Sequence, residues 1–158
     1  MKKFEELMSV SSEIENITAE DAKKKINDPN LKFYSIGDIK LSGNKQLGLV
    51  IQNKLKLSSS TGSKNTLFLN INLEKYRTTR EKDSSNKITK YDIKLIANIS
   101  IKTSSEIIER KFETIDFYDV SSDYSDTIRA QKNLESELAK NIADELISYL
   151  KFKFNNDI

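Results

Sequence analysis

The sequence predicts an α+β fold, a two-layer sandwich in which a four-stranded sheet is packed by two helices in the order β-α-β-β-β-α. Apolar residues alternate with polar ones in three segments between Leu67 and Tyr118, which is typical of strands with one buried face. Apolar residues recur every three or four positions in two further segments, which is typical of amphipathic helices. A sheet with one apolar face needs a helical layer to cover it.

The length of 158 residues suits one domain. Residues 1–30 are charged and polar, and they predict a loosely ordered or helical N-terminal extension. Within them, Thr18–Asp21 resembles a capping box that starts a short helix, which would stop near Pro29. Residues 31–154 are predicted to form the single α+β domain.

The first strand is predicted over Leu31–Leu41, with an irregularity at Gly37 and a break at residues 42–44. Helical spacing over Leu47–Leu55 then predicts a helix of about three turns. The run Ser58–Asn65 is rich in Ser, Thr and Gly and predicts a loop.

Three strands follow, over Leu67–Leu73, Tyr91–Ile101 and Ile108–Tyr118. Polar residues 77–87 are expected to connect the first two, and residues 102–106 to form a hairpin. After a break at residues 121–125, Ile128–Leu150 predicts one long helix of roughly seven turns. The predicted core sets the sheet residues Leu69, Ile71, Ile93, Leu95 and Ile99 against the helix residues Val50, Ile51, Leu138, Ile142 and Leu146.

Composition argues against catalysis. The chain has no Cys and no His, so nucleophilic and metal chemistry based on these residues is excluded. Its four glycines match no phosphate-binding fingerprint, and adjacent acidic pairs such as Asp144 and Glu145 are interpreted as solvated charges. We therefore expect no catalytic residues, no metal site and no cofactor.

The charge balance limits the class of partner. The 26 basic and 24 acidic residues give a net charge of +2 and are spread along the chain, which argues against nucleic-acid binding. The first ten residues lack the apolar run of a signal peptide, and no segment is long and apolar enough to span a membrane. The sequence therefore predicts either a cytosolic protein or one whose targeting segment has been replaced.

One group of basic residues is a candidate binding site, and we call it the basic cluster. It gathers around the predicted connection between two strands and consists of Arg77, Arg80, Lys82, Lys87 and Lys90. Exposed connections are usually charged, so the cluster is interpretable as a solubilising turn. The alternative is a tip that contacts phosphate or carboxylate groups, which arginine binds in a bidentate manner. The sequence alone leaves both interpretations open.

The order of elements and several strings resemble the LptE-type lipopolysaccharide-assembly lipoproteins. The resemblance covers Phe33–Phe152 and is carried by the strings IGDIKLSGNKQLGLVIQNKL, LFLNINLEKYRTTREKDSSNKITKYDIKLIANISI, IIERKFETIDFYDV and NLESELAKNIADELISYL. It is a match of pattern and order. The family carries a signal peptide ending in a lipid-modified Cys, whereas this chain has neither, and residues 1–30 do not fit the pattern.

The resemblance implies a non-enzymatic component that plugs and supports an LptD-type outer-membrane β-barrel and contacts lipopolysaccharide. It assigns lipopolysaccharide to the basic cluster. It also implies the periplasmic face of the outer membrane, with membrane association only through a lipid anchor absent from this chain. Without a removed signal peptide, a cytoplasmic location is expected. The alternative is a periplasmic or cytosolic binding module of another family, such as an auxiliary lipoprotein of a transporter.

Overall fold

The structure is a computed structural model that describes residues 34–60 and 65–155. Its four strands form one sheet in the order β1-β2-β3-β4. They are β1 (Ser35–Gly43), β2 (Thr66–Lys82), β3 (Ile88–Lys102) and β4 (Ile107–Asp119). β1 runs parallel to β2, whereas the β2–β3 and β3–β4 pairs are antiparallel.

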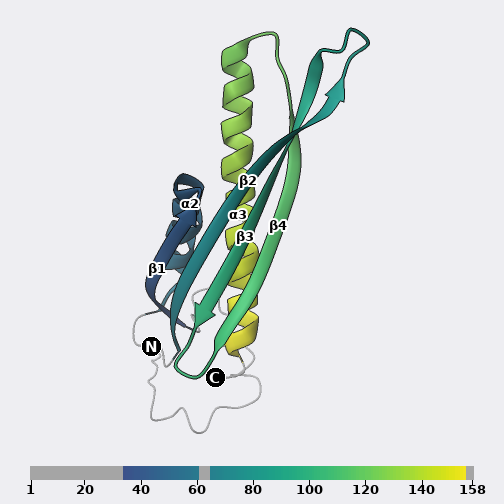
Figure 1. Ribbon diagram of the computed structural model, residues 1–158. Helices are drawn as coiled ribbons and strands as arrows, with labels where there is room; N and C mark the ends of the chain where they lie inside the picture. Colours follow the sequence, from purple (N-terminus) through teal and green to yellow (C-terminus); the bar gives the residue numbers. More distant parts are fainter. Residues whose placement is uncertain (1–33, 61–64, 156–158) are drawn as a thin grey trace, which may run out of the picture. The chain divides into compact units, whose positions relative to one another are not determined.

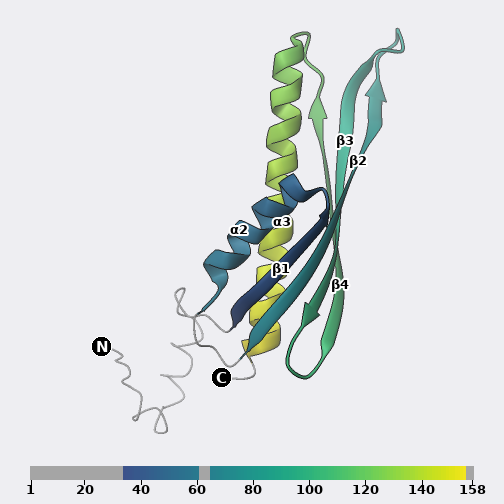
Figure 2. The ribbon, with the colours of Figure 1, turned by 60° about the vertical axis from the view of Figure 1, so that its left-hand side comes forward.

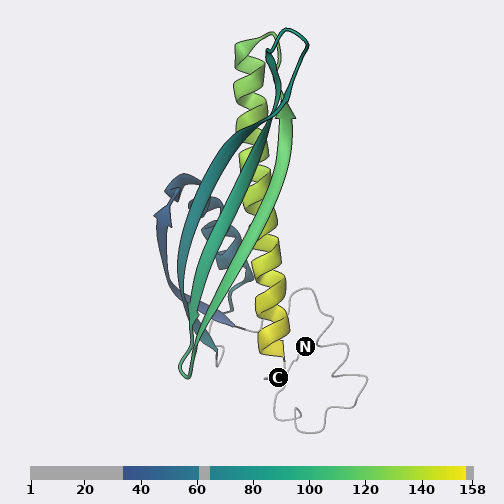
Figure 3. The same cartoon turned by 45° about the vertical axis from the view of Figure 1, so that its right-hand side comes forward.

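Two helices, α2 (Lys45–Ser58) and α3 (Tyr124–Asn155), cover the same face of the sheet (Figures 1 and 2). The opposite face is left open, and in Figure 3 the helices lie behind the strands. The predicted fold class and element order are therefore confirmed. No helix in the described ranges is long and apolar enough to cross a bilayer.

The junction between β1 and α2 explains one glycine. Gly43 has a φ of +75°, and a Cβ atom there would lie 2.2 Å from the backbone oxygen of Leu73. Only glycine tolerates both conditions. The next residue, Asn44, caps α2, because its side chain accepts a hydrogen bond from the Leu47 amide at 3.0 Å.

The core lies between the covered face and the helices. Alternate residues of β2 and β3 are almost fully buried there, as the predicted pattern requires: Leu67, Leu69, Ile71, Leu73, Ile93, Leu95, Ala97, Ile99 and Ile101. The helices bury Ile51, Leu55, Leu138, Ile142, Leu146 and Leu150. Nine of the ten predicted core residues are buried. Val50 is the exception and is half-buried, because α2 turns Ile51 and Leu55 toward the sheet instead.

The prediction for residues 77–87 is wrong in its bounds. β2 continues through Lys82, so the connection is only the turn between Lys82 and Ile88. Every residue of β2 from Lys75 onward is exposed, so buried and exposed positions do not alternate there. This part of the strand is held by pairing with β3, and a pattern of apolar residues cannot reveal it.

Other element bounds also differ from the prediction. β1 extends through Ser42 and Gly43, and the expected irregularity at Gly37 is present as a register shift between Ile36 and Ile39. α3 begins at Tyr124, inside the expected break, and its 32 residues exceed the predicted seven turns. Phe154 lies four residues after Leu150 and is buried, so the apolar spacing continues one turn beyond the predicted end. The predicted extension at residues 1–30 and part of the loop after α2 lie outside the described residues.

Substitution of Leu138 tests the packing between the layers. Leu138 is only 2% exposed, so Leu138→Asp would bury an unpaired carboxylate. We expect the free energy of unfolding to fall by about 3–5 kcal/mol in chemical denaturation. The control is Asn141→Asp, an exposed position on the same helix, where stability should be nearly unchanged. Equal stability of both variants would contradict this packing.

Candidate functional site

The structure places the basic cluster on the β2–β3 hairpin. Arg77, Arg80 and Lys82 lie on β2, Lys90 lies on β3, and Lys87 lies in the turn. This hairpin reaches the same end of the fold as the first turns of α3 (Figure 1). The five side chains are therefore close in sequence and in the fold, but their contacts place them in three different environments.

Arg77 lies on the helix-facing side of the hairpin. Its guanidinium carbon is 4.3 Å from the centroid of the Tyr91 ring, and Tyr91 stacks on Tyr118 with ring centroids 5.7 Å apart. A hydrogen bond with the Tyr118 side chain raises the pKa of Arg77 above its ordinary value. Arg77 therefore helps to join the strands, because its charge is held over an aromatic face.

A polar network continues from this stack to α3. The Tyr118 hydroxyl donates to Gln131 at 3.1 Å, and Gln131 donates to the Glu135 carboxylate at 2.8 Å. Lys75 pairs with the same carboxylate at 2.9 Å. Glu135 is only 8% exposed, so these donors replace the water that it loses on burial. The first half of α3 is therefore attached to the hairpin by polar contacts as well as by packing.

Arg80 and Lys90 lie on the open face of the sheet, around Phe117. Arg80 is 4.5 Å and Lys90 is 5.2 Å from the centroid of that ring. Each also has a carboxylate partner: Arg80 pairs with Asp92 at 3.0 Å, and Lys90 pairs with Asp119. The hydrogen bond with Asp119 raises the pKa of Lys90. These two charges are already compensated, so a bound anion would have to compete with the carboxylates.

Lys82 and Lys87 are exposed at the tip, and no ion pair within residues 34–60 and 65–155 involves either. The turn between them is stabilised by Asp83. One carboxylate oxygen of Asp83 accepts hydrogen bonds from the amides of Ser85 and Lys87 and from the Ser85 hydroxyl, at 2.8–2.9 Å. Asn86 takes a φ of 68°, which asparagine tolerates better than most residues. The tip thus offers two exposed cations, neither in a close ion pair among the described residues, on an ordered turn.

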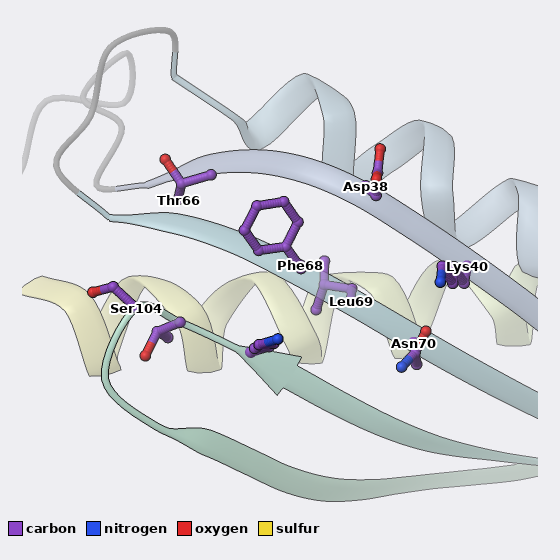
Figure 4. Close-up of a pocket in the computed structure, with 9 residues that line it drawn as sticks. Asp38, Lys40, Thr66, Phe68, Leu69, Asn70 and Ser104 are labelled. Carbon is purple, nitrogen blue, oxygen red and sulfur yellow. The ribbon is translucent and has the colours of Figure 1, made fainter.

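The open face carries a second candidate, a hollow of about 690 Å³ near the β3–β4 turn. In Figure 4 the Phe68 ring lies beside β1, with Thr66 and Asn70 on either side along β2. Seven of the nine residues that line it are polar or charged, and the lining consists of Asp38, Lys40, Thr66, Phe68, Leu69, Asn70, Lys102, Thr103 and Ser104.

Sequence reasoning missed this hollow. Two signals could have found it: a phenylalanine at an outward-facing position of an alternating strand, and a glycine inside the neighbouring strand. A Cβ atom on Gly37 would lie 2.6 Å from the Phe68 ring, so the two residues fit each other. The lysines of the lining come from separate strands and could not be grouped before the register was known.

Neither region presents a constellation of catalytic groups. Among the residues that the structure describes, no set of three or more acidic side chains is arranged to hold a metal ion. What the two regions offer is binding chemistry: ammonium groups, hydroxyls, an amide and exposed rings.

Comparison with solved structures finds the same fold in lipoproteins. Rare lipoprotein B from Shewanella oneidensis matches with a TM-score of 0.58 and 17% identity, over 77% of this chain and 100% of that chain. A candidate lipoprotein from Caulobacter crescentus matches with a TM-score of 0.53 and 14% identity, over 76% and 92% of the two chains. Lipoprotein B from Nitrosomonas europaea matches with a TM-score of 0.52 and 4% identity, over 73% and 84%.

At these identities the likeness establishes a shared fold. No protein-family model matches the chain, and no curated protein matches its sequence.

Titration of Asp83 tests the geometry of the tip. Hydrogen bonds from Lys87 and Ser85 lower its pKa below the ordinary value of 3.8. The contribution of Asp83 to stability is therefore present above that ordinary value and is lost as the pH falls through the lowered pKa. In carboxyl-detected NMR titrations we expect Ser85→Ala to return the pKa of Asp83 toward 3.8. An unchanged pKa in this variant would contradict the described turn.

Proposed function

We propose that the chain is a non-enzymatic, LptE-like component of outer-membrane assembly, which plugs and supports an LptD-type β-barrel in lipopolysaccharide transport. The fold shared with rare lipoprotein B from Shewanella oneidensis carries this proposal, because the match spans all of that chain. The match of element order and strings to the LptE-type family also supports it. The proposed location is the periplasmic face of the outer membrane, where proteins of this type are anchored by lipid.

The open face of the sheet suits such a partner. It combines charged and amide side chains with separate exposed apolar residues, among them Tyr76, Ile115 and Phe117. Barrel interiors that hold a plug are polar, and a face of mixed charge can pair with such a wall without burying unpaired charges. We therefore propose that the part of the open face around Tyr76, Ile115 and Phe117 meets the barrel.

The tip of the hairpin is the proposed contact for lipopolysaccharide. Within the basic cluster, Lys82 and Lys87 are the strongest candidates, since Arg77, Arg80 and Lys90 are engaged with aromatic rings and carboxylates. Charge-assisted hydrogen bonds to phosphate are stronger than neutral ones, although each exposed pair contributes less than about 1 kcal/mol. Binding through the tip is therefore expected to be weak and sensitive to salt.

Association with the barrel is tested by co-expression. The full chain, tagged and co-expressed with its cognate LptD-type barrel, should co-purify with it in mild detergent at a one-to-one ratio. The Ile115→Glu variant adds a charge to the open face and should reduce recovery, while Asn141→Asp on the helical side should not. If the parent chain recovers no barrel, the assignment to this function fails.

The lipopolysaccharide contact is tested by removing the two lysine charges of the tip. Lys82→Ser with Lys87→Ser should weaken binding to purified lipopolysaccharide several-fold at low salt and leave the unfolding curve unchanged, because neither side chain has an ion-pair partner among the described residues. Lys132→Ser with Lys140→Ser is the matched control, since it removes the same charge from the exposed side of α3. Equal affinities of the two double variants would identify the tip as a solubilising turn.

A further inference from the structure

We propose that the hollow on the open face binds one acidic sugar unit, meaning a single sugar ring that carries a phosphate or a carboxylate. The inference does not rest on the barrel partner, because it is drawn from the lining alone. The hollow is formed by β1, β2 and the β3–β4 turn, so it is separate from the tip of the β2–β3 hairpin.

Phe68 supplies an exposed aromatic platform. Its side chain is 45% exposed on the open face, where an isolated ring would gain by being covered. The ring lies against Gly37, and any larger residue there would force it away, since a Cβ atom would be 2.6 Å from the ring. A ring that is exposed on one side and lies against β1 on the other can pack against the apolar C–H face of a sugar.

Two ammonium groups flank the platform. Lys102 on β3 is the register partner of Phe68, and Lys40 on β1 is the register partner of Asn70. Within residues 34–60 and 65–155 neither lysine forms an ion pair. Both are therefore available to an anionic group, and an ammonium bonds a phosphate or a carboxylate as a point charge.

The remaining groups match sugar hydroxyls. Asn70 and Ser104 can both donate and accept hydrogen bonds, while the Asp38 carboxylate can only accept them. Asp38 would repel a bare phosphate. It can, however, accept hydrogen bonds from the hydroxyls of a sugar whose own phosphate or carboxylate lies beside the lysines. The lining thus offers partners both for the hydroxyls and for the anionic group of such a ring.

The hollow is large enough to admit one ring. Its volume of about 690 Å³ falls within the roughly 300–1,000 Å³ typical of small-molecule sites, although it is an open depression on the sheet. A site of this kind is expected to bind weakly, and a longer saccharide could reach beyond it across the open face.

The test is an NMR titration of the full chain at low salt with four probes: glucose 1-phosphate, glucuronate, glucose and inorganic phosphate. We expect at least one of the two acidic sugars to shift the amide signals of Phe68, Asn70 and Lys102, with higher affinity than either glucose or phosphate. The comparison of glucose 1-phosphate with glucuronate identifies which anionic group the site prefers.

Two variants assign the roles. Lys40→Gln with Lys102→Gln should weaken acidic-sugar binding by at least about tenfold, the loss expected for two charge-assisted hydrogen bonds, while Lys132→Gln with Lys140→Gln should not. Phe68→Ala should weaken the binding of both acidic sugars but not that of inorganic phosphate. Two results would overturn the proposal: no localised shifts with either acidic sugar, or inorganic phosphate binding as tightly as glucose 1-phosphate. Because barrel co-purification is measured separately, failure here leaves the proposed function untouched.

Discussion

The antiparallel pairing of β2 with β3 carries a continuous row of buried side chains, and every other element is placed against it. β1 pairs with one side of β2 and β4 with the far side of β3, while both helices cover the face where the buried side chains lie. An apolar face of this length has to be removed from water, and here the two helices form the layer that covers it. The position of the helices on one side follows from that constraint, and so does the openness of the other side.

This constraint also explains what could be read from the sequence. Where burial is asymmetric, as at Leu69, Ile71 and Ile93, the period of two is visible and the predicted core is confirmed. Beyond Lys75 every residue of β2 is exposed, so this part of the sequence carries no period and β2 was predicted too short. Pairing between strands depends on register, which apolar patterning fixes only while one face is buried.

The basic cluster shows that a binding site, too, is hard to predict before the strand register is known. Its five residues were grouped because they are neighbours in the sequence, but strand geometry sends Arg77 to one face and Arg80 to the other. Three of the five have aromatic or acidic partners that come from β3 and β4, among them Asp92 and Asp119. The hollow presents the opposite case. Lys40 and Lys102 are far apart in sequence, and they line the same hollow because β1 and β3 both pair with β2.

The turn at Asp83 has a consequence for how this fold can diverge. Its hydrogen bonds are internal, connecting Asp83 with Ser85 and Lys87, and none reaches the buried core. Insertions and deletions at this tip would therefore change its length and charge at little cost to the folding of the sheet. Proteins that share the scaffold can vary the hairpin to suit different partners, so sequence identity at the tip should decline faster than anywhere else in the sheet.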